Sequence, residues 1–156
     1  HDHAMEVKSI ELNDFIADIS TRFHHALQTK SIHLHHTPTE KINIKTNTKL
    51  LQMVIENLLS NAIKYSDEGK NIYITTGTQH GKTYFKIQDE GFGIATEEIQ
   101  KIFNPFYRAH ALTQKGIKGT GLGLSIVQKA CDQLGVSIDI QSRVGDGTVV
   151  RLDWVG

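Results

Sequence analysis

Three glycines at a spacing of two, in the stretch GTGLGLSIVQKACDQLG at residues 119–135, run directly into an amphipathic helical pattern. Gly119, Gly121 and Gly123 carry no Cβ, so main-chain N–H groups there can approach a bound group closely. The positive end of the helix dipole points to the same place and favours an anion. The stretch therefore suggests a phosphate site, although a flexible loop before an ordinary helix explains this motif alone equally well.

The composition is that of one domain with no preference for nucleic acid. The chain has 156 residues, enough for a sizeable core. Its 17 Lys and Arg balance 17 Asp and Glu, whereas nucleic-acid-binding proteins usually have a basic excess. The single cysteine, Cys131, excludes an intrachain disulfide, fits a reducing compartment and is expected to pack in the core. No apolar run reaches the length of a membrane span.

The first residues, HDHAM, are typical of the end of a histidine tag. We assign residues 1–10 to a tag remnant and linker, and residues 11–156 to the domain. His33 and His35 alternate on one face of an expected strand, but no Cys, Asp or Glu stands close in sequence to complete a metal site. An ordinary surface is favoured there.

The order of the expected elements indicates an α+β fold. Apolar residues recur at three and four from Leu12 to Leu27, which predicts one helix with a buried stripe. Asn47 is a candidate N-cap for a second helix ending near Tyr65. Strands are expected at 31–37 and 41–46, in a hairpin at 71–91 turning around His80 and Gly81, and in a closing hairpin at 136–155. This order predicts a two-layer α/β sandwich, with a mixed, mostly antiparallel sheet and about three helices on one face.

A polar segment rich in helix breakers follows a short helix expected near residues 95–103. A loop this long inside a compact domain usually has a function, often as a lid. We expect a mobile lid over about residues 95–118.

Four polar residues of the second helix share one face. Asn57, Asn61, Lys64 and Tyr65 stand at i, i+4, i+7 and i+8. Amide oxygens can ligate a hard cation such as Mg²⁺, and a lysine can neutralise phosphate oxygens. A solvated helix face is the alternative.

The sequence DEGFGI ends the central strand pair. Asp89 stands where the strand ends, and Gly91 and Gly93 allow the chain to turn sharply. A carboxylate there can accept a hydrogen bond from the amino group of a base. The motif is weak alone, because Asp and Gly are common turn residues.

The combination and its order carry more weight than any single motif. NLLSNAIKYS, DEGFGI, IFNPFYRA and GTGLGLSIV, in this order, resemble the N box, first glycine box, F box and second glycine box of the catalytic ATP-binding domain of sensor histidine kinases, in the GHKL superfamily. The resemblance covers roughly residues 11–156. It implies the two-layer sandwich shared with DNA gyrase and mismatch-repair ATPases, with ATP and Mg²⁺ as cofactors.

The resemblance also implies roles for individual residues. The backbone from Gly119 to Leu124 would cradle the phosphates, Asn61 would hold Mg²⁺, and Asp89 would read the adenine amine. Thr148 in GDGTVV matches a threonine that supports the adenine site directly or through water. The nucleotide-binding set implied is Asn57, Asn61, Lys64, Tyr65, Asp89, Gly91, Gly93, Ile94, Phe106, Tyr107, Lys118, Gly119, Thr120, Gly121, Leu122, Gly123, Leu124 and Thr148.

The lid would run from Phe103 and Phe106 to Lys118. Arg108 is the expected lid cation that stabilises charge on the transferred γ-phosphoryl group, with Lys64 as a second catalytic residue. Lys115 and Lys118 could share the role of Arg108, and the sequence does not rank them.

The same fold also hydrolyses ATP, so three classes compete. In the hydrolase branches a glutamate four residues before the magnesium Asn acts as general base, whereas this chain has the neutral amide of Asn57 there. Glu56 is adjacent but points about 100° away around the helix. This favours transfer to a protein nucleophile over a GHKL-type ATPase or serine kinase. A nucleotide-binding regulatory module without activity is the third possibility.

No good phosphoacceptor is visible, because His24 and His25 lack the acidic residue and proline motif that follow the family's acceptor histidine. The resemblance therefore implies an acceptor on a separate dimerisation domain, and a response regulator receiver domain as second partner. We expect the isolated domain to be a monomer without direct membrane contact, from the cytoplasmic portion of a membrane-bound bacterial sensor.

Overall fold

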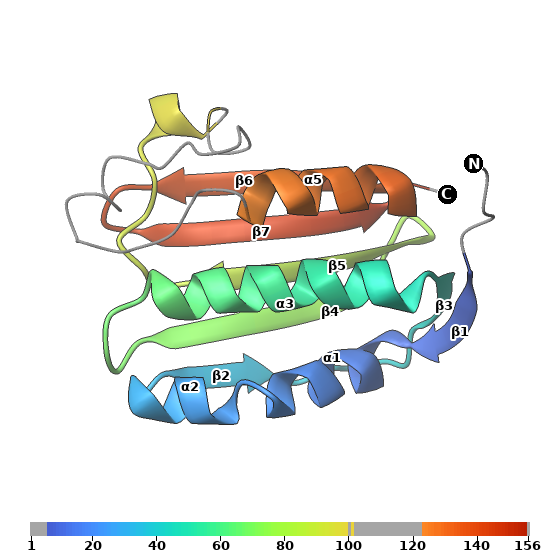
Figure 1. Cartoon of the computed structure of the whole chain (residues 1–156), viewed down its shortest axis with the longest axis horizontal. Helices are drawn as coiled ribbons and strands as arrows, with labels where there is room; N and C mark the ends of the chain where they lie inside the picture. Colours follow the sequence, from blue (N-terminus) through green and yellow to red (C-terminus); the bar gives the residue numbers. More distant parts are fainter. Residues whose placement is uncertain (1–5, 100, 102–122, 156) are drawn as a thin grey trace.

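The computed structural model describes residues 6–99, 101 and 123–155. Figure 1 shows two layers, with helices covering one face of a sheet. The five strands have the order β2 (His33–His36), β4 (Asn71–Gln79), β5 (Lys82–Asp89), β7 (Gly147–Trp154) and β6 (Val136–Arg143). The β2–β4 pair is parallel and the other three pairs are antiparallel. The expected mixed, mostly antiparallel sheet is confirmed.

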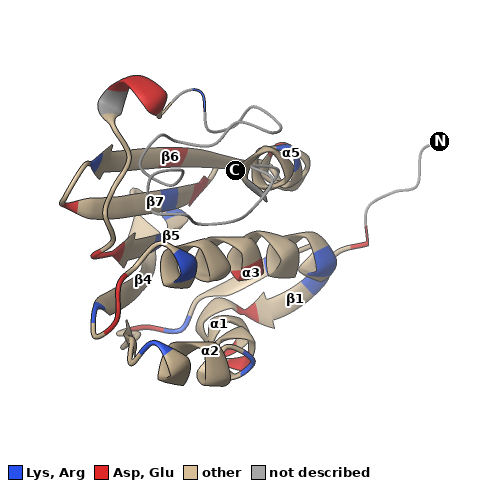
Figure 2. Cartoon of the chain, turned by 60° about the vertical axis from the view of Figure 1, so that its left-hand side comes forward, with Lys and Arg blue, Asp and Glu red and all other residues tan. Residues whose placement is uncertain are grey.

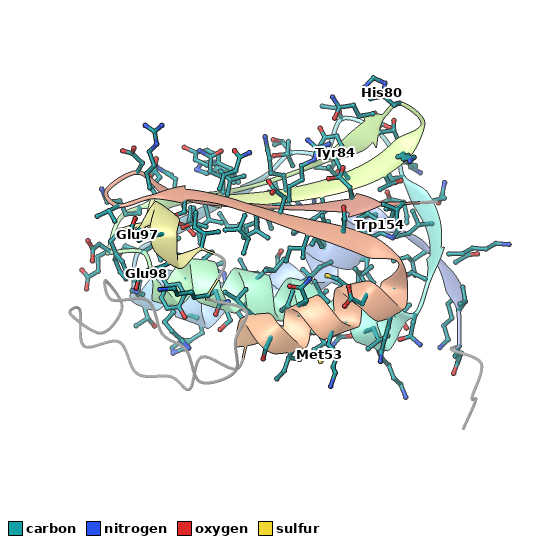
Figure 3. The ribbon with its side chains drawn as sticks, turned by 90° about the horizontal axis from the view of Figure 1, so that it is seen from above. Met53, His80, Tyr84, Glu97, Glu98 and Trp154 are labelled. Atoms are coloured by element: carbon teal, nitrogen blue, oxygen red, sulfur yellow. The ribbon has the colours of Figure 1, made fainter. Side chains whose placement is uncertain are left out.

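The helix layer contains α1 (Leu12–Thr21), α2 (His24–Thr29), α3 (Thr48–Lys64) and α5 (Gly123–Leu134). Figure 3 shows the layers edge-on, with Tyr84 on the side of the sheet away from the helices and Met53 on the far side of the helices. Alternation along the strands produces this arrangement, since Phe85 is fully buried and Tyr84 is half-buried. The core between the layers includes Ile16, Leu59, Phe85, Val127, Cys131 and Leu152. The packing role expected for Cys131 is confirmed.

Helix α3 begins and ends as its sequence predicts. Asn47 Oδ1 accepts the Leu50 N–H at 2.9 Å, so the amide caps the helix. The Tyr65 N–H donates to the Asn61 carbonyl at 3.0 Å, where the helix ends. Asn61 and Tyr65 are thereby fixed in the last turn, facing the end of β5.

The single helix expected over residues 12–27 is wrong, because α1 ends before α2 begins. The N–H groups of Arg22 and Phe23 donate to Ile19 and Ser20, three residues back, at 3.0 Å each. These tighter bonds end the α-helical turn. Arg22 then forms ion pairs with Asp18 at 2.9 Å and Glu56 at 3.0 Å, which hold the break against α3.

A short strand that the sequence reading missed precedes the first helix. β1 (Lys8–Glu11) pairs antiparallel with β3 (Asn43–Thr46) in a separate two-stranded sheet, with Ile10 opposite Ile44. Residues 8–10, assigned to a linker, therefore form part of a strand. The Glu11 carboxylate caps α1 and also accepts the Ile42 N–H at 2.8 Å.

The expected hairpin turn is confirmed. His80 and Gly81, both at positive φ, join β4 to β5. Of the helix expected near residues 95–103, the structure describes the 3₁₀ turn η1 (Thr96–Glu98). Within the described ranges, none of the helices combines the length and apolar character required to cross a bilayer.

Candidate functional site

A pocket lies between the end of α3, the sheet and the beginning of α5. It brings together six of the predicted nucleotide-binding residues: Asn61, Tyr65, Asp89, Ile94, Leu124 and Thr148. Its remaining lining is apolar, from Leu58, Ala62, Ile87, Ile140 and Val150. A mostly apolar cleft with a few converging polar groups is the usual form of a small-molecule site.

Asp89 is the charged group at the base of this pocket. It is the last residue of β5 and only 9% exposed. Its Oδ1 accepts the Gly91 N–H at 2.8 Å and the Thr148 N–H at 3.1 Å. Burial raises the pKa of Asp89 to about 6, and the two main-chain hydrogen bonds oppose that rise. Above this pH the pocket therefore presents a carboxylate, which only accepts hydrogen bonds.

Two glycines allow the loop after Asp89 to pass close to its neighbours. A Cβ on Gly91 would lie 2.6 Å from the Tyr65 carbonyl oxygen. Gly93 has φ +73°, and a Cβ there would lie 1.8 Å from the Arg143 carbonyl oxygen. The loop consequently packs closely between the end of α3 and the β6–β7 turn. In that turn the Gly145 N–H donates to the Phe92 carbonyl oxygen at 2.8 Å.

Ser142 belongs to this site, and the sequence reading missed it. Its hydroxyl lies 2.8 Å from Thr148 Oγ1 and accepts the Ile94 N–H at 2.7 Å. A signal was present: in β6 the residues Val136, Ile138 and Ile140 face the helices, and Ser142 continues this alternation. A polar residue at a position that faces the core requires partners, which here are groups of the pocket wall.

Five described residues of the predicted set do not line this pocket: Asn57, Lys64, Gly91, Gly93 and Gly123. Asn57 donates from Nδ2 to the Met53 carbonyl at 2.7 Å and borders a separate hollow with Arg22, Phe23, Glu56 and Ser60. Lys64 is exposed in the last turn of α3. Glu56, which faces Arg22 in that separate hollow, is not among the described residues that line the pocket.

Most of the predicted lid and most of the second glycine box lie outside the described residues. These are Phe103, Phe106, Tyr107, Arg108, Lys115, Lys118, Gly119, Thr120, Gly121 and Leu122. Gly123 begins α5, and Leu124 in its first turn lines the pocket. The beginning of this helix therefore lies beside Asp89 and Thr148.

The described residues offer few side-chain ligands for a hard cation. Among residues 6–99, 101 and 123–155, no three His, Cys, Asp or Glu side chains are arranged to hold a metal ion. Asn61 supplies one amide to the pocket. This donor set fits Mg²⁺, which commonly takes few protein ligands and completes its shell with phosphate oxygens and water.

The 17 Lys and Arg and the 17 Asp and Glu of the chain balance in number. Figure 2 shows acidic and basic residues interspersed over the helices, strand ends and connecting segments. His35, considered above for metal binding, instead lies 2.8 Å from Asn71 Oδ1 and stacks on Tyr73 with ring centroids 4.8 Å apart.

Comparison with known proteins supports the expected family. The chain is 36% identical over 118 residues to the sensor histidine kinase YkoH of Bacillus subtilis, covering 76% of this chain and 26% of that protein. The chain thus spans about a quarter of the length of this curated relative.

Solved structures share the fold. The nucleotide-free catalytic domain of histidine kinase ThkA has a TM-score of 0.83 and 28% identity, covering 96% of this chain and 97% of that one. Histidine kinase ThkA in complex with the response regulator protein TrrA has a TM-score of 0.79 and 24% identity, covering 95% and 41%. The second likeness concerns the fold alone.

The family match extends from residue 46 to residue 155, from the last residue of β3 to the end of the closing hairpin. It includes every residue that lines the pocket. The chain belongs to the histidine kinase-, DNA gyrase B- and HSP90-like ATPases.

Proposed function

We propose that this domain binds Mg·ATP in the pocket above Asp89 and transfers the γ-phosphoryl group to a histidine on a separate dimerisation domain. The observation that carries the proposal is the buried Asp89 carboxylate, whose Oδ1 is held by two main-chain N–H groups. This arrangement leaves Oδ2 to accept the amino group of adenine, while the apolar walls enclose the ring.

The phosphates would extend from the adenosine toward Asn61 and the N-terminus of α5. Asn61 would supply an amide oxygen to Mg²⁺, which with the nucleotide would neutralise phosphate charge. Tyr65 lies one turn further along α3 and would contact the ribose or a phosphate. For the lid, Arg108 remains the proposed cation, with Lys115 and Lys118 as the alternatives. Lys64, in the last turn of α3, is the second proposed catalytic residue.

Transfer to a protein is favoured over hydrolysis because Asn57 stands four residues before Asn61, where the hydrolases have a glutamate as general base. Asn57 is a neutral amide, and Glu56 is paired with Arg22 at 3.0 Å. The relatives' names favour histidine as the acceptor, and the receiver domain of a response regulator as the next partner, in two-component signalling. We place the domain in the cytoplasmic portion of a membrane-bound sensor.

Calorimetric titration with ADP and a non-hydrolysable ATP analogue, in Mg²⁺ and in EDTA, tests the proposal. Magnesium-dependent binding near micromolar affinity is expected. Supplying the dimerisation domain should then allow phosphohistidine to form from ATP. Folded protein without nucleotide binding would overturn the proposal, and phosphorylation of the isolated domain at His24 or His25 would overturn the separate acceptor.

A further inference from the structure

Ser142 stands behind Thr148 and makes three hydrogen-bonded contacts. Its Oγ accepts the Ile94 N–H at 2.7 Å, donates to the Gly147 carbonyl oxygen at 2.9 Å and lies 2.8 Å from Thr148 Oγ1. Its partners therefore come from the end of the first glycine box and from the beginning of β7.

A count of hydrogens fixes the direction of the third contact. A serine hydroxyl has one hydrogen to donate and two lone pairs to accept. The Ile94 N–H can only donate, and the Gly147 carbonyl can only accept, so Ser142 gives its one hydrogen to Gly147. Thr148 must then donate to Ser142, because two lone pairs facing each other at 2.8 Å would repel.

Thr148 therefore has only lone pairs left for the pocket. The adjacent Asp89 is also an acceptor when ionised, and the Thr148 N–H joins the two residues at 3.1 Å. Two neighbouring acceptors match a ligand edge that carries donors, such as the exocyclic amine of a 6-aminopurine. The carbonyl oxygen of a 6-oxopurine would face lone pairs at the same place.

We propose that Ser142 is a positioning residue that holds the Thr148 hydroxyl as an acceptor and thereby helps the pocket to prefer 6-amino over 6-oxo purine nucleotides. This inference rests on the proposed nucleotide site. Ser142 does not line the pocket, but it would help to set the specificity of the pocket for its nucleotide.

The test is the ratio of the dissociation constants of IDP and ADP, measured by calorimetry at pH 8 in Mg²⁺, where Asp89 is ionised. In Ser142→Ala the Thr148 hydroxyl is free to rotate and donate, so the ratio should fall about fivefold. Ser142→Thr keeps a hydroxyl and should restore the wild-type ratio. If the role of Ser142 is merely structural, Ser142→Ala weakens the binding of IDP and ADP by the same factor. The ratio is then unchanged, and this result would overturn the inference.

A second pair of variants separates Ser142 from general damage to the site. Thr148→Val removes the acceptor and should itself lower the ratio about fivefold. Adding Ser142→Ala to it should cause no further fall, because no hydroxyl remains to be oriented. An unchanged ratio in Thr148→Val overturns the inference even if Ser142→Ala does not fold. Absence of ADP binding by the folded wild type would instead reject the nucleotide site itself.

Discussion

The Thr148 main-chain N–H donates to Oδ1 of Asp89 at 3.1 Å, across 59 positions of sequence. The bond joins the end of β5 to the beginning of β7, which are neighbours in the sheet. Gly91 reaches the same oxygen from the following loop. The carboxylate is therefore fixed by backbone from both directions, and its position depends on the sheet itself.

Asp89→Asn should abolish most nucleotide affinity while preserving this backbone. The amide oxygen can still accept both N–H groups, but an NH₂ group replaces the second oxygen and faces a donor on the base. A charge-assisted hydrogen bond contributes about 1.5–3 kcal/mol. Its loss should therefore make the dissociation constant for ADP roughly tenfold to hundredfold larger.

Calorimetry at pH 8 measures this effect, with Asp139→Asn as the control. Asp139 is exposed on β6, so its variant makes the same chemical change outside the pocket. Wild-type ADP affinity in Asp89→Asn would remove Asp89 from the site.

Without nucleotide, the same variant should be more stable than the wild type at neutral pH. Burial raises the pKa of Asp89 from 3.8 to about 6, so the folded state holds this proton more tightly than the unfolded state. The resulting stability is fully present below pH 3.8 and is lost as the pH rises through 6. The shift corresponds to about 3 kcal/mol of unfolding free energy, as an order of magnitude.

Urea unfolding of both proteins between pH 4 and pH 8 isolates this contribution. Other titrating groups, including His36, whose pKa burial lowers, are common to both proteins and cancel in the difference. The free energy of unfolding of Asp89→Asn should increase relative to that of the wild type as the pH rises. A difference that is constant across this range would show that Asp89 does not titrate there.

Asn61→Ala should remove the effect of magnesium on nucleotide affinity. Asn61 is the amide of α3 that lines the pocket, and alanine leaves no oxygen to ligate the ion. The affinity for ADP in Mg²⁺ should fall to the value in EDTA. Gln52→Ala is the matched control, because that amide lies on the same helix and bonds Glu56 at 3.2 Å. If Asn61→Ala keeps the full magnesium effect, the ion is bound elsewhere.

The sequence predicted those parts of the fold that depend on local pattern. Asn47 as a cap, the His80–Gly81 turn and the alternation of β6 are properties of a few adjacent residues, and the structure has all three. The break at Arg22 was missed because Ile19, Phe23 and Leu27 keep a spacing of four through it, with no glycine or proline as a signal. β1 was missed because its few residues become a strand only by pairing with β3.

The sequence pointed to several residues of the pocket but not to the hydrogen bonds that connect them. The N box, the first glycine box and the motif GDGTVV pointed to Asn61, Asp89 and Thr148, which the structure brings into one pocket. The alternation of β6 placed Ser142 toward the core, but its partners could not be predicted, because Ile94 and Thr148 are 48 and 6 positions away in the sequence. Spacing identifies side chains that share a face, whereas a hydrogen-bond network across strands requires coordinates.

Gly93→Ala should cost far more stability than Gly69→Ala, although both glycines have positive φ. Gly69, at φ +80°, has open space where a Cβ would be, so alanine there suffers backbone strain alone, about 1 kcal/mol. At Gly93 the new Cβ would also lie 1.8 Å from the Arg143 carbonyl oxygen, so the loop and the β6–β7 turn must separate. Urea unfolding should show a loss of unfolding free energy at least about 2 kcal/mol larger than in Gly69→Ala.

The same displacement moves the Ile94 N–H away from Ser142. The affinity for ADP should therefore fall in Gly93→Ala and not in Gly69→Ala. Equal losses of stability in the two variants would mean that the loop does not depend on this close approach.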